Sequence, residues 1–400
     1  MPEWKNYTIG ELCDTISEKY KRNDDEVILI NTSDVLEGKI LNHEKVKNEN
    51  LKGQFKKTFK KDDILFSEIR PANKRFAYVD FSSTEQYIAS TKLMVLRTKK
   101  EIILPRYLFY ILKSDSMLEK LQHLAETRSG TFPQITFSGE LSNLEVIIPD
   151  FETQLKILRI LDSIEYKIEI NEKINNNLLE QADSIFKSWF IDFEPFNNEF
   201  PNDWNNGTIE DLSEEIICGK TPSTKKKEYY GNDIPFITIP DMHNSTYIIK
   251  TERYLSVLGA DSQPKKTLPK NSICVSCIGT AGLVSLVSID SQTNQQINSI
   301  IPKKNISPYY IYLLMRGKYD EINKYGQGGS TIVNLNKREF SKLEVTIPSN
   351  DVLLKFDKIV KHMFEVILNN QNENEKLSNL RDYLLPNLIN GIMDVSQIDI

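Results

Sequence analysis

The chain has 400 residues, of which 40% are hydrophobic and 26% are charged, a balance that is typical of folded proteins and argues against wholesale disorder. Its length suffices for at least two folding units. The formal net charge of −6 argues weakly against a nucleic-acid partner, although the distribution of charge matters more than its sum. The start MPEWKNYTIGEL lacks a signal-peptide plan, and no apolar run reaches the roughly 18 residues of a membrane span, which predicts a cytoplasmic protein without a membrane partner.

The first half of the sequence predicts short strands, one helix, a loop and a final strand. Pro105 opens the helix, because a missing N–H costs nothing at the first helical position. A Gly/Ser/Thr-rich loop follows at Arg128–Ile135, and the last strand ends at Ile148-Pro149. The strands predicted before the helix are Val27–Asn31, Ile64–Ile69 and Leu93–Arg97.

A long helical stretch begins after Pro149. Its seam residues step alternately by four and three, and this average of about 3.5 is typical of a coiled coil rather than of a helix packed on one sheet. At its end, Trp189, Phe190 and Phe193 form either an exposed docking patch or a cluster under the second half, and for Phe193 we favour the second alternative. The seam positions are Ile157, Leu161, Ile164, Ile168, Asn171, Asn175, Leu178, Ala182, Ile185 and Trp189.

The second half repeats the first in the same order. WKNYTIGEL at Trp4–Leu12 returns as WNNGTIEDL at Trp204–Leu212, and LSNLEVIIP at Leu141–Pro149 returns as FSKLEVTIP at Phe340–Pro348. A period near 200 residues is far too long for a solenoid and indicates a duplicated domain. The predicted counterparts are strands at Pro235–Ile239, Ile273–Ile278 and Val284–Ile289, a helix opened by Pro308, a loop at Gly326–Leu335 and a strand ending at Ile347-Pro348.

A second long helix closes the chain with a matching seam. Asn370 and Asn374 fall at the seam places of Asn171 and Asn175. A seam asparagine lowers stability but fixes register and partner, because a slipped pairing would bury unpaired amides. If the two helices run antiparallel, the four asparagines meet near the middle. The seam positions are Phe356, Val360, Met363, Ile367, Asn370, Asn374, Leu377, Arg381, Leu384 and Leu388.

These features predict an α/β (α+β) fold with pseudo-twofold symmetry. Two duplicated globular domains are separated by two long helices that form an antiparallel coiled coil, a rod of roughly 55 Å. Such a rod exceeds one turn of B-DNA, about 34 Å, and suits two readers held apart. The predicted segments are 1–150, 151–194, 195–348 and 349–392.

In the order of these pieces, the chain resembles the specificity subunit of a type I restriction-modification enzyme over essentially its whole length. The resemblance rests on SIFKSWFIDFEPF at Ser184–Phe196, LRDYLLPNLINGIMDV at Leu380–Val395, GKTPST at Gly219–Thr224 and the GGSTIVNL loop. GKTPST has no counterpart in the first half, where GTFPQI replaces GGSTIVNL. The family's recognition domains differ between halves, so this departure fits the resemblance.

The resemblance implies a non-catalytic subunit with two target-recognition domains, 1–150 and 195–348. Together they would recognise a bipartite, non-palindromic site in double-stranded DNA. The helices 151–194 and 349–392 would carry two methyltransferase subunits, which methylate adenine from S-adenosylmethionine, and two ATP-dependent restriction subunits would complete the nuclease. S-adenosylmethionine, ATP and Mg are thus implied for the partner subunits, and no cofactor is expected on this chain.

Candidate DNA-binding residues are the loop Arg, Lys, Asn, Gln, Ser and Thr residues, whose side chains can hydrogen-bond base edges or phosphates. Two basic stretches, Lys45–Lys61 and Lys220–Lys227, either contact phosphate or are ordinary solvated faces. The candidates in the first half are Arg70, Asn73, Lys74, Arg75, Arg128, Ser129, Thr131 and Gln134. Those in the second half are Lys220, Thr221, Ser223, Lys225, Asn294, Gln295, Gln296, Gln327, Ser330, Thr331 and Asn334.

Neither a metal site nor catalysis by this chain is predicted. Cys274 and Cys277 form a lone C-x-x-C in an apolar run without a second ligand pair, so a core strand is favoured over zinc. Asp150 with Glu165 and Lys167 spells a nuclease-like PD…E-x-K. Glu165 and Lys167 lie two apart in the seam-patterned helix, however, and so point in different directions. The sequence also lacks a G-x-x-x-x-G-K-[ST] loop and the Asn/Asp-Pro-Pro-Tyr/Phe mark of an adenine methyltransferase.

Two other functions remain open. A coiled-coil protein-interaction scaffold is mildly favoured by the acidic net charge, and it would show no salt-dependent affinity for DNA. A stand-alone DNA-binding regulator would bind DNA without methyltransferase partners.

Overall fold

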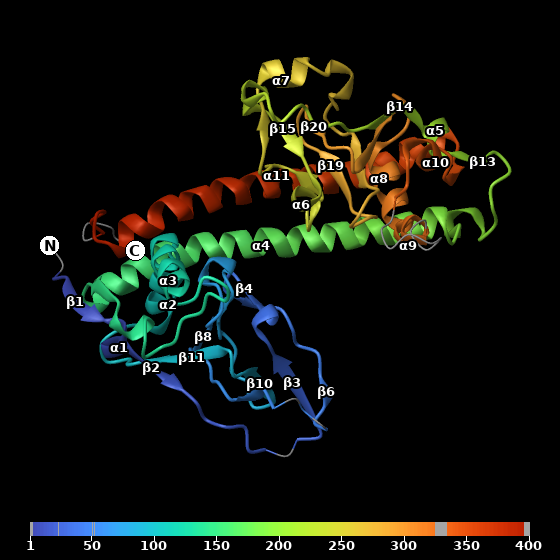
Figure 1. Cartoon of the computed structure of the whole chain (residues 1–400). Helices are drawn as coiled ribbons and strands as arrows, with labels where there is room; N and C mark the ends of the chain where they lie inside the picture. Colours follow the sequence, from blue (N-terminus) through green and yellow to red (C-terminus); the bar gives the residue numbers. More distant parts are fainter. Residues whose placement is uncertain (1–2, 23, 50, 52, 325–333, 396–400) are drawn as a thin grey trace. The chain divides into compact units, whose positions relative to one another are not determined.

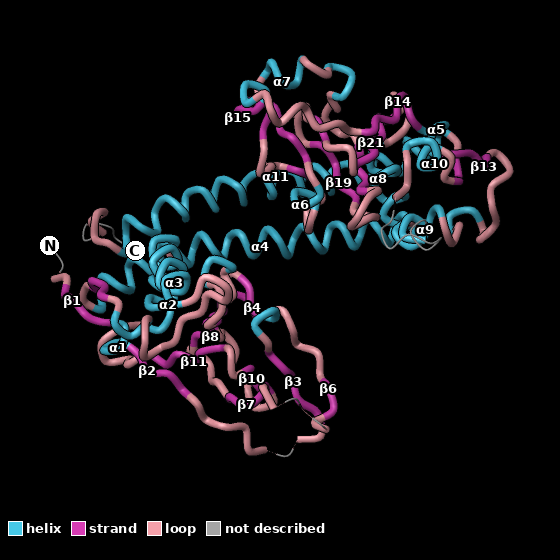
Figure 2. Tube along the Cα trace, in the orientation of Figure 1, coloured by secondary structure: helices cyan, strands magenta, loops and turns pink. Residues whose placement is uncertain are grey.

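The computed structural model describes residues 3–22, 24–49, 51, 53–324 and 334–395. It divides into two compact units, one formed by residues 1–165 with 379–400 and the other by residues 166–378. Two helices, α4 (Phe151–Phe190) and α11 (Asn350–Ile389), contribute to both units; they are the long cyan tubes of Figure 2. Each unit therefore combines a globular segment with the beginning of one long helix and the end of the other.

The first unit is built on three small sheets. Strand β1 pairs antiparallel with β12, a second sheet has the order β2-β11-β8-β9, and a third has the order β6-β3-β10-β7, in which β3 and β10 are parallel. The strands are β1 (Lys5–Thr8), β2 (Cys13–Ile16), β3 (Glu26–Ile30), β6 (Val46–Lys47), β7 (Phe55–Lys57), β8 (Ile64–Ser67), β9 (Phe76–Tyr78), β10 (Tyr87–Ser90), β11 (Leu93–Thr98) and β12 (Glu145–Ile148), with the hairpin β4 (Val35–Leu36) and β5 (Lys39–Ile40).

The second unit repeats this plan with one more strand in its main sheet and one fewer in its third sheet. Strand β13 pairs antiparallel with β22, a five-stranded sheet has the order β14-β21-β18-β19-β16, and a third has the order β17-β15-β20. The strands are β13 (Asn205–Thr208), β14 (Ser213–Cys218), β15 (Tyr230–Ile237), β16 (Tyr247–Ile248), β17 (Tyr254–Leu255), β18 (Ile273–Ser276), β19 (Val284–Val287), β20 (Gln292–Thr293), β21 (Ile297–Pro302) and β22 (Glu344–Ile347). The short helices are α5 (Ile209–Leu212), α6 (Ile239–Met242), α7 (Val257–Asp261), α9 (Tyr319–Lys324) and α10 (Lys337–Ser341).

The order of strands in the main sheet recurs between the units. β2-β11-β8-β9 in the first corresponds to β14-β21-β18-β19 in the second. The register of the terminal pair recurs as well, since Thr8 lies opposite Glu145 and Thr208 lies opposite Glu344. Both threonines begin a one-turn helix with a capping box, which satisfies the first free N–H groups of that helix. Because each unit contains both sheets and helices, each has a mixed α/β fold.

One helix in each unit lies between the main sheet and the long helices. In the first unit, α2 (Pro105–Lys113) contacts β9 and β11, and its Arg106 Nε is 2.6 Å from Asp162 Oδ1 of α4 (Figure 1). In the second, α8 (Pro308–Gly317) contacts β18 and β19, and Tyr309 stacks on Phe364 of α11 at 4.5 Å. Both helices begin at proline, as the sequence predicts.

The structure makes β21, rather than the predicted strand at Val284–Ile289, the counterpart of β11. Helix caps correct two further predicted elements. A single helix was expected after Pro105, but Ser114 ends α2 in an extended conformation and caps a second helix, α3 (Asp115–Arg128), by accepting from Met117 N. The strand expected at Pro235–Ile239 ends at Ile237, because Thr238 and Asp241 form a capping box that starts α6. In both places a short polar side chain supplied the N-cap that began a new helix.

Aromatic residues at the end of α4 pack into the core of the second unit. Phe190 is only 4% exposed, and its ring lies 4.9 Å from those of Tyr310 and Phe356. Trp189 and Phe193 are half-buried against the same core. The prediction that Phe193 packs under the second half is confirmed.

The predicted seam positions of both long helices are all buried or half-buried. Within the second unit, Asn171 Nδ2 donates to Asn374 Oδ1 at 2.8 Å, and Asn370 Nδ2 donates to Asn175 Oδ1 at 2.9 Å. Because the lower number of one helix pairs with the higher number of the other, these stretches run antiparallel. The prediction that the four asparagines meet is confirmed, whereas their role in fixing the register stays a prediction.

Candidate nucleic-acid interface

Two predicted loops of the first unit meet beyond the end of β8. Ile135 N donates to Glu68 O at 2.8 Å, and Arg70 N donates to Pro133 O at 3.1 Å. An isolated antiparallel bridge joins Ile69 to Gln134. The segment after β8 and the segment after α3 therefore present their candidate residues from one place.

The free side chains of this loop pair are few. Arg70, Asn73 and Thr131 are exposed, and Arg70 has a left-handed backbone with φ 45°. The other candidates of the first unit are engaged within the protein. Their contacts are Arg75 Nη1 to Ser33 O (3.0 Å), Arg128 Nη1 to Glu140 Oε2 (3.2 Å), Lys74 Nζ to Asp115 Oδ1 (3.5 Å), Lys92 Nζ to Gln134 Oε1 (3.4 Å) and Phe132 N to Ser129 Oγ (3.2 Å).

The second unit brings its candidate loops together by the same kind of bridge. Leu335 N donates to Cys277 O at 2.9 Å, and a bridge joins Ile278 to Asn334, as Ile135 and Glu68 are joined in the first unit. The loop after β14 joins this group, because Thr221 Oγ1 donates to Gln295 Oε1 at 2.7 Å.

A glycine permits the close approach of these loops. A Cβ on Gly219 would lie 2.1 Å from Asn294 O, which is far inside contact distance, so only glycine fits there. Lys220 N then donates to Thr293 O at 2.9 Å. Of the remaining candidates on the loop after β14, Ser223 and Lys225 are exposed together with Lys220.

The three amide residues at the turn before β21 have different surroundings. Asn294 is 8% exposed, and its Nδ2 donates to Gln296 Oε1 at 3.1 Å. Gln295, which lies between them, is exposed, as is Asn334 on the opposing segment. Gln327, Ser330 and Thr331 lie outside the residues that the structure describes.

A family model described as "Type I restriction modification DNA specificity domain" matches residues 1–180 and 201–381. The chain belongs to this family. Relatives that match most of this chain are specificity subunits of type I restriction enzymes, so the chain is a DNA-specificity subunit rather than an enzyme.

Individual relatives agree with this assignment. The specificity subunit of the type I restriction enzyme HindI from Haemophilus influenzae is 41% identical to this chain over an alignment 462 positions long. The alignment covers 98% of this chain and all of the relative. The MjaIX specificity subunit from Methanocaldococcus jannaschii is 29% identical over 75% of this chain and 71% of its own length. The solved S subunit from M. genitalium shares the fold with a TM-score of 0.57 and 17% identity, over 99% of this chain and 97% of that chain.

This specificity subunit also has a basic hollow in its first unit that the sequence indicated only in part. Lys60 and Lys61 belong to a predicted basic stretch, and the fold places Lys21 and Arg22 beside them around a hollow of about 410 Å³. Its lining residues come from three segments that are distant in the sequence, 20–22, 58–61 and 82–85, so no single segment identifies it. The remaining lining residues are Tyr20, Thr58, Phe59, Ser82, Thr84 and Glu85.

Replacing Lys21, Lys60 and Lys61 together by alanine is expected to weaken DNA binding about equally for all sequences. Each lost phosphate contact should reduce the slope of log affinity against log salt by about 0.9, so the slope should fall by up to about 3. Binding of the complex with its methyltransferase partner to matched and scrambled duplexes at several salt concentrations measures this. An unchanged slope would exclude the hollow from the phosphate interface.

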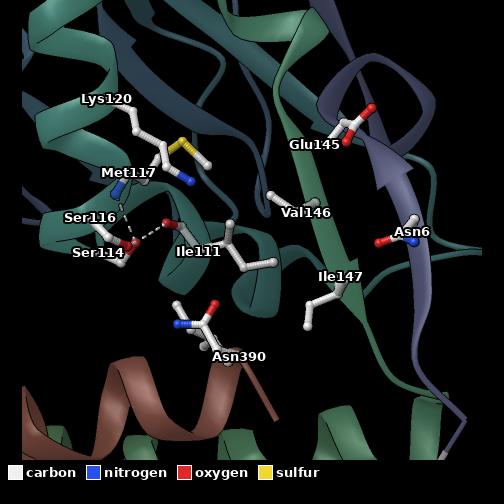
Figure 3. A pocket seen from close by; sticks show the side chains of 11 residues that line it. Asn6, Ile111, Ser114, Ser116, Met117, Lys120, Glu145, Val146, Ile147 and Asn390 are labelled. Atoms are coloured by element: carbon white, nitrogen blue, oxygen red, sulfur yellow. Dashed lines mark hydrogen bonds between the residues drawn. The ribbon is translucent and has the colours of Figure 1, made fainter. Parts of the chain in front are cut away.

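A second hollow of about 250 Å³ lies beside β12, between α2, α3 and the end of α11 (Figure 3). Ser114 points into it but is committed as a cap, accepting from Met117 N and donating to Ile111 O at 2.8 Å. Lys120 and Glu145 are its charged residues. A serine that accepts and donates within its own helices is a structural group. Within the described residues its hydroxyl bonds only to Ile111, Ser116 and Met117 and to no base of the kind that nucleophilic catalysis requires.

The fold does not bring the residues of the nuclease-like motif together. Asp150 Oδ1 accepts from Thr153 N at 2.8 Å and so caps α4. Glu165 lies fifteen residues further along that helix, roughly 22 Å away at 1.5 Å per residue. Lys167 pairs instead with Glu373 at 3.3 Å. No metal could be shared by groups so far apart.

The cysteine pair lies in the core, as predicted. Cys274 and Cys277 are 0% and 1% exposed, and burial raises the pKa of both thiols to about 12. Protonated thiols are poor metal ligands. Within the described residues there is no group of three or more His, Cys, Asp or Glu side chains placed to hold a metal ion, and no described helix is long and apolar enough to cross a membrane.

Proposed function

We propose that the chain is the subunit of a type I restriction-modification complex that reads a bipartite, non-palindromic DNA site. Each unit reads one half-site. The chain thereby directs adenine methylation and restriction, which are carried out by two methyltransferase and two restriction subunits. Membership of the DNA specificity family supports DNA recognition by this chain, and the proposal extends it to the form of the site and the partners.

The observation that carries the proposal is one loop bridge that occurs twice with different side chains. The bridge between Glu68 and Ile135 has its counterpart between Cys277 and Leu335. The first bridge is followed by the exposed Arg70, whereas the second is followed by Gly279 and carries the exposed Asn334 on its opposing segment. Two equal scaffolds with unequal side chains suit two different half-sites, because base identity is read by the donors and acceptors of the side chains.

The architecture in the proposal is a duplicated pair of domains, 1–150 and 195–348, with α4 and α11 as an antiparallel coiled coil and a pseudo-twofold axis. Recurrent strand order supports the duplication. The two asparagine pairs support an antiparallel seam with a fixed register. S-adenosylmethionine, ATP and Mg are assigned to the partner subunits, and no cofactor is assigned to this chain.

Methyl-adenine sequencing of cells that express this chain with its methyltransferase partner tests the proposal. Methylation is expected at a two-part motif, and it should vanish in cells that lack only this chain. Cells that lack only the methyltransferase serve as the control. Exchange of residues 1–150 for those of another family member should change one half of the motif and leave the other.

Two results would contradict the proposal. A methylated motif that persists without this chain would assign sequence recognition to another subunit, and an active partner with no motif would favour a scaffold. A change in both halves of the motif after the exchange would refute one reader per half-site.

A further inference from the structure

We propose that Arg70 reads a guanine in one half-site and that Gln295, held by Thr221, reads an adenine in the other. Both contacts are made from the major groove. This inference rests on the proposed function, because it names the bases read by the two loop pairs of the same interface.

Arg70 occupies a position at which the second unit has glycine. DILFSEI at Asp63–Ile69 corresponds to SICVSCI at Ser272–Ile278, so the next residues, Arg70 and Gly279, are equivalent. Both have a left-handed backbone, with φ 45° for Arg70 and φ 80° for Gly279. Glycine adopts this conformation freely, whereas a side chain is strained there. An arginine kept in a turn that suits glycine indicates a role for its side chain.

The side chain of Arg70 is exposed, while the neighbouring cations Arg75 and Arg128 are bound to Ser33 O and Glu140 respectively. Within the described residues no partner binds the Arg70 guanidinium. Its planar donors match the O6 and N7 acceptors that guanine presents in the major groove, the commonest specific contact of arginine with DNA. Arg70 is thus the guanidinium of this loop pair that is exposed and has no partner among the described residues.

In the second unit the reader comes from the adjacent loop. Gly279 offers no side chain, and a Cβ there would lie 3.7 Å from Gln296 Nε2. The Gln296 amide is itself committed, accepting from Asn294 Nδ2 and donating to Ile278 O at 3.5 Å. Gln295, between them, is left to project outward.

Thr221 pre-orients the Gln295 amide through a hydrogen bond of 2.7 Å to Oε1. This bond uses one lone pair of that oxygen, so a second lone pair and both Nε2 hydrogens remain. That combination of acceptor and donor matches N6 and N7 of adenine. The exposed Lys220 beside it is a flexible point charge, which suits phosphate better than a base edge.

Arg70→Gly tests the first contact without disturbing the turn, since glycine suits its backbone. The variant should fold normally, with a thermal midpoint within about 2 °C of the parent. Discrimination for one guanine should fall by about 5- to 150-fold, the range expected for one bidentate contact. Competition binding to duplexes with every single-base change, using the complex with the methyltransferase partner, measures this.

Gln295→Ala should cause an equal loss at one adenine in the other half-site. Thr221→Val should cause a smaller loss at the same base, because the amide stays but is no longer oriented. Asn232→Ala, an exposed amide at the start of β15, is the matched control and should change nothing. Each variant must also leave the other half-site unaltered.

The outcomes separate this inference from the proposed function. A parent motif that survives Arg70→Gly and Gln295→Ala unchanged would overturn the inference and leave the proposed function standing. A loss of discrimination at an A·T pair with Arg70→Gly, or at a G·C pair with Gln295→Ala, would overturn the base assignment. A parent chain that confers no motif would overturn both.

Discussion

Replacement of Phe190 by alanine is expected to lower the free energy of unfolding of the second unit by about 3–5 kcal/mol. The ring joins the end of α4 to the globular segment, with Tyr310 and Phe356 at 4.9 Å and Trp204 at 5.6 Å. Its removal leaves a cavity among rigid aromatic neighbours, which cannot collapse to fill it. Chemical denaturation followed by tryptophan fluorescence measures this, because two of the three tryptophans, Trp189 and Trp204, lie in this unit.

Ile191→Ala is the matched control for that variant. Ile191 follows Phe190 in the chain but is 57% exposed, so its truncation should cost no more than about 0.5 kcal/mol. Equal losses for both variants would show that the aromatic cluster does not stabilise the unit. In the complex, Phe190→Ala should impair reading of the half-site served by the second unit before the other.

The mixed α/β class and the meeting of the four asparagines could be predicted from periodicity and repetition, whereas the coiled coil and the domain duplication stay predictions. The asparagines recur at the same places in the two predicted seams. An antiparallel pairing of the helices was expected to bring Asn171 close to Asn374, and their side chains are hydrogen-bonded. The predicted loops also met, since each followed a strand or helix with an equivalent in the other half. Such patterns depend on many residues, so a wrong interpretation of any one residue does not change the prediction.

Local outcomes were harder to predict because single hydrogen bonds decide them. Ser114 splits one expected helix into two, and no periodicity marks its role as an N-cap. Asn294, Gln295 and Gln296 are chemically alike in sequence, yet their surroundings differ. Asn294 is buried, Gln295 is exposed and accepts from Thr221 Oγ1, and Gln296 donates to Ile278 O. The basic hollow was missed in part because Lys21 and Lys60 become neighbours only through the fold.

The two units differ where α2 and α8 contact the long helices. Alignment of LEVIIP with LEVTIP makes Glu165 equivalent to Phe364, and Arg381 equivalent to Ala182. In the first unit, Glu165 Oε1 lies 2.7 Å from Lys113 Nζ and 3.5 Å from Arg381 Nη1. In the second, Phe364 stacks on Tyr309 at 4.5 Å. One junction is held by charge and the other by aromatic packing.

Protonation at the charged junction follows from burial and neighbours. Burial alone would raise the pKa of Glu165, but the charge and hydrogen bond of Lys113, with the charge of Arg381, hold that pKa below its ordinary value. Burial lowers the pKa of Lys113. The carboxylate of Glu165 raises this pKa, but the positive charges of Arg381 and Arg106 oppose that effect, so the net shift is downward. Glu165 is therefore the group whose charge holds the junction together.

Glu165→Gln is expected to destabilise the first unit by about 2–3 kcal/mol at neutral pH. Removal of one partner from a buried ion pair costs about 3–5 kcal/mol, and the value is reduced here because the Glu165 side chain is 24% exposed. Glu169→Gln, which breaks the surface pair with Lys173 on the same helix, should cost about 0.5 kcal/mol or less. Urea denaturation of the full chain measures both.

The stabilisation that Glu165 provides is expected to depend on pH. The pKa of Glu165 in the folded chain lies below the ordinary 4.5, so its contribution is complete above that value and is lost as the pH falls through the lowered pKa. The stability difference between the parent and Glu165→Gln should thus be constant from about pH 8 to pH 5.5 and shrink below about pH 4.5. A difference that persisted unchanged in acid, or that matched Glu169→Gln at every pH, would mean that shape rather than charge holds this junction. In that case the charge of Glu165 would not distinguish the helix contact of the first unit from that of the second.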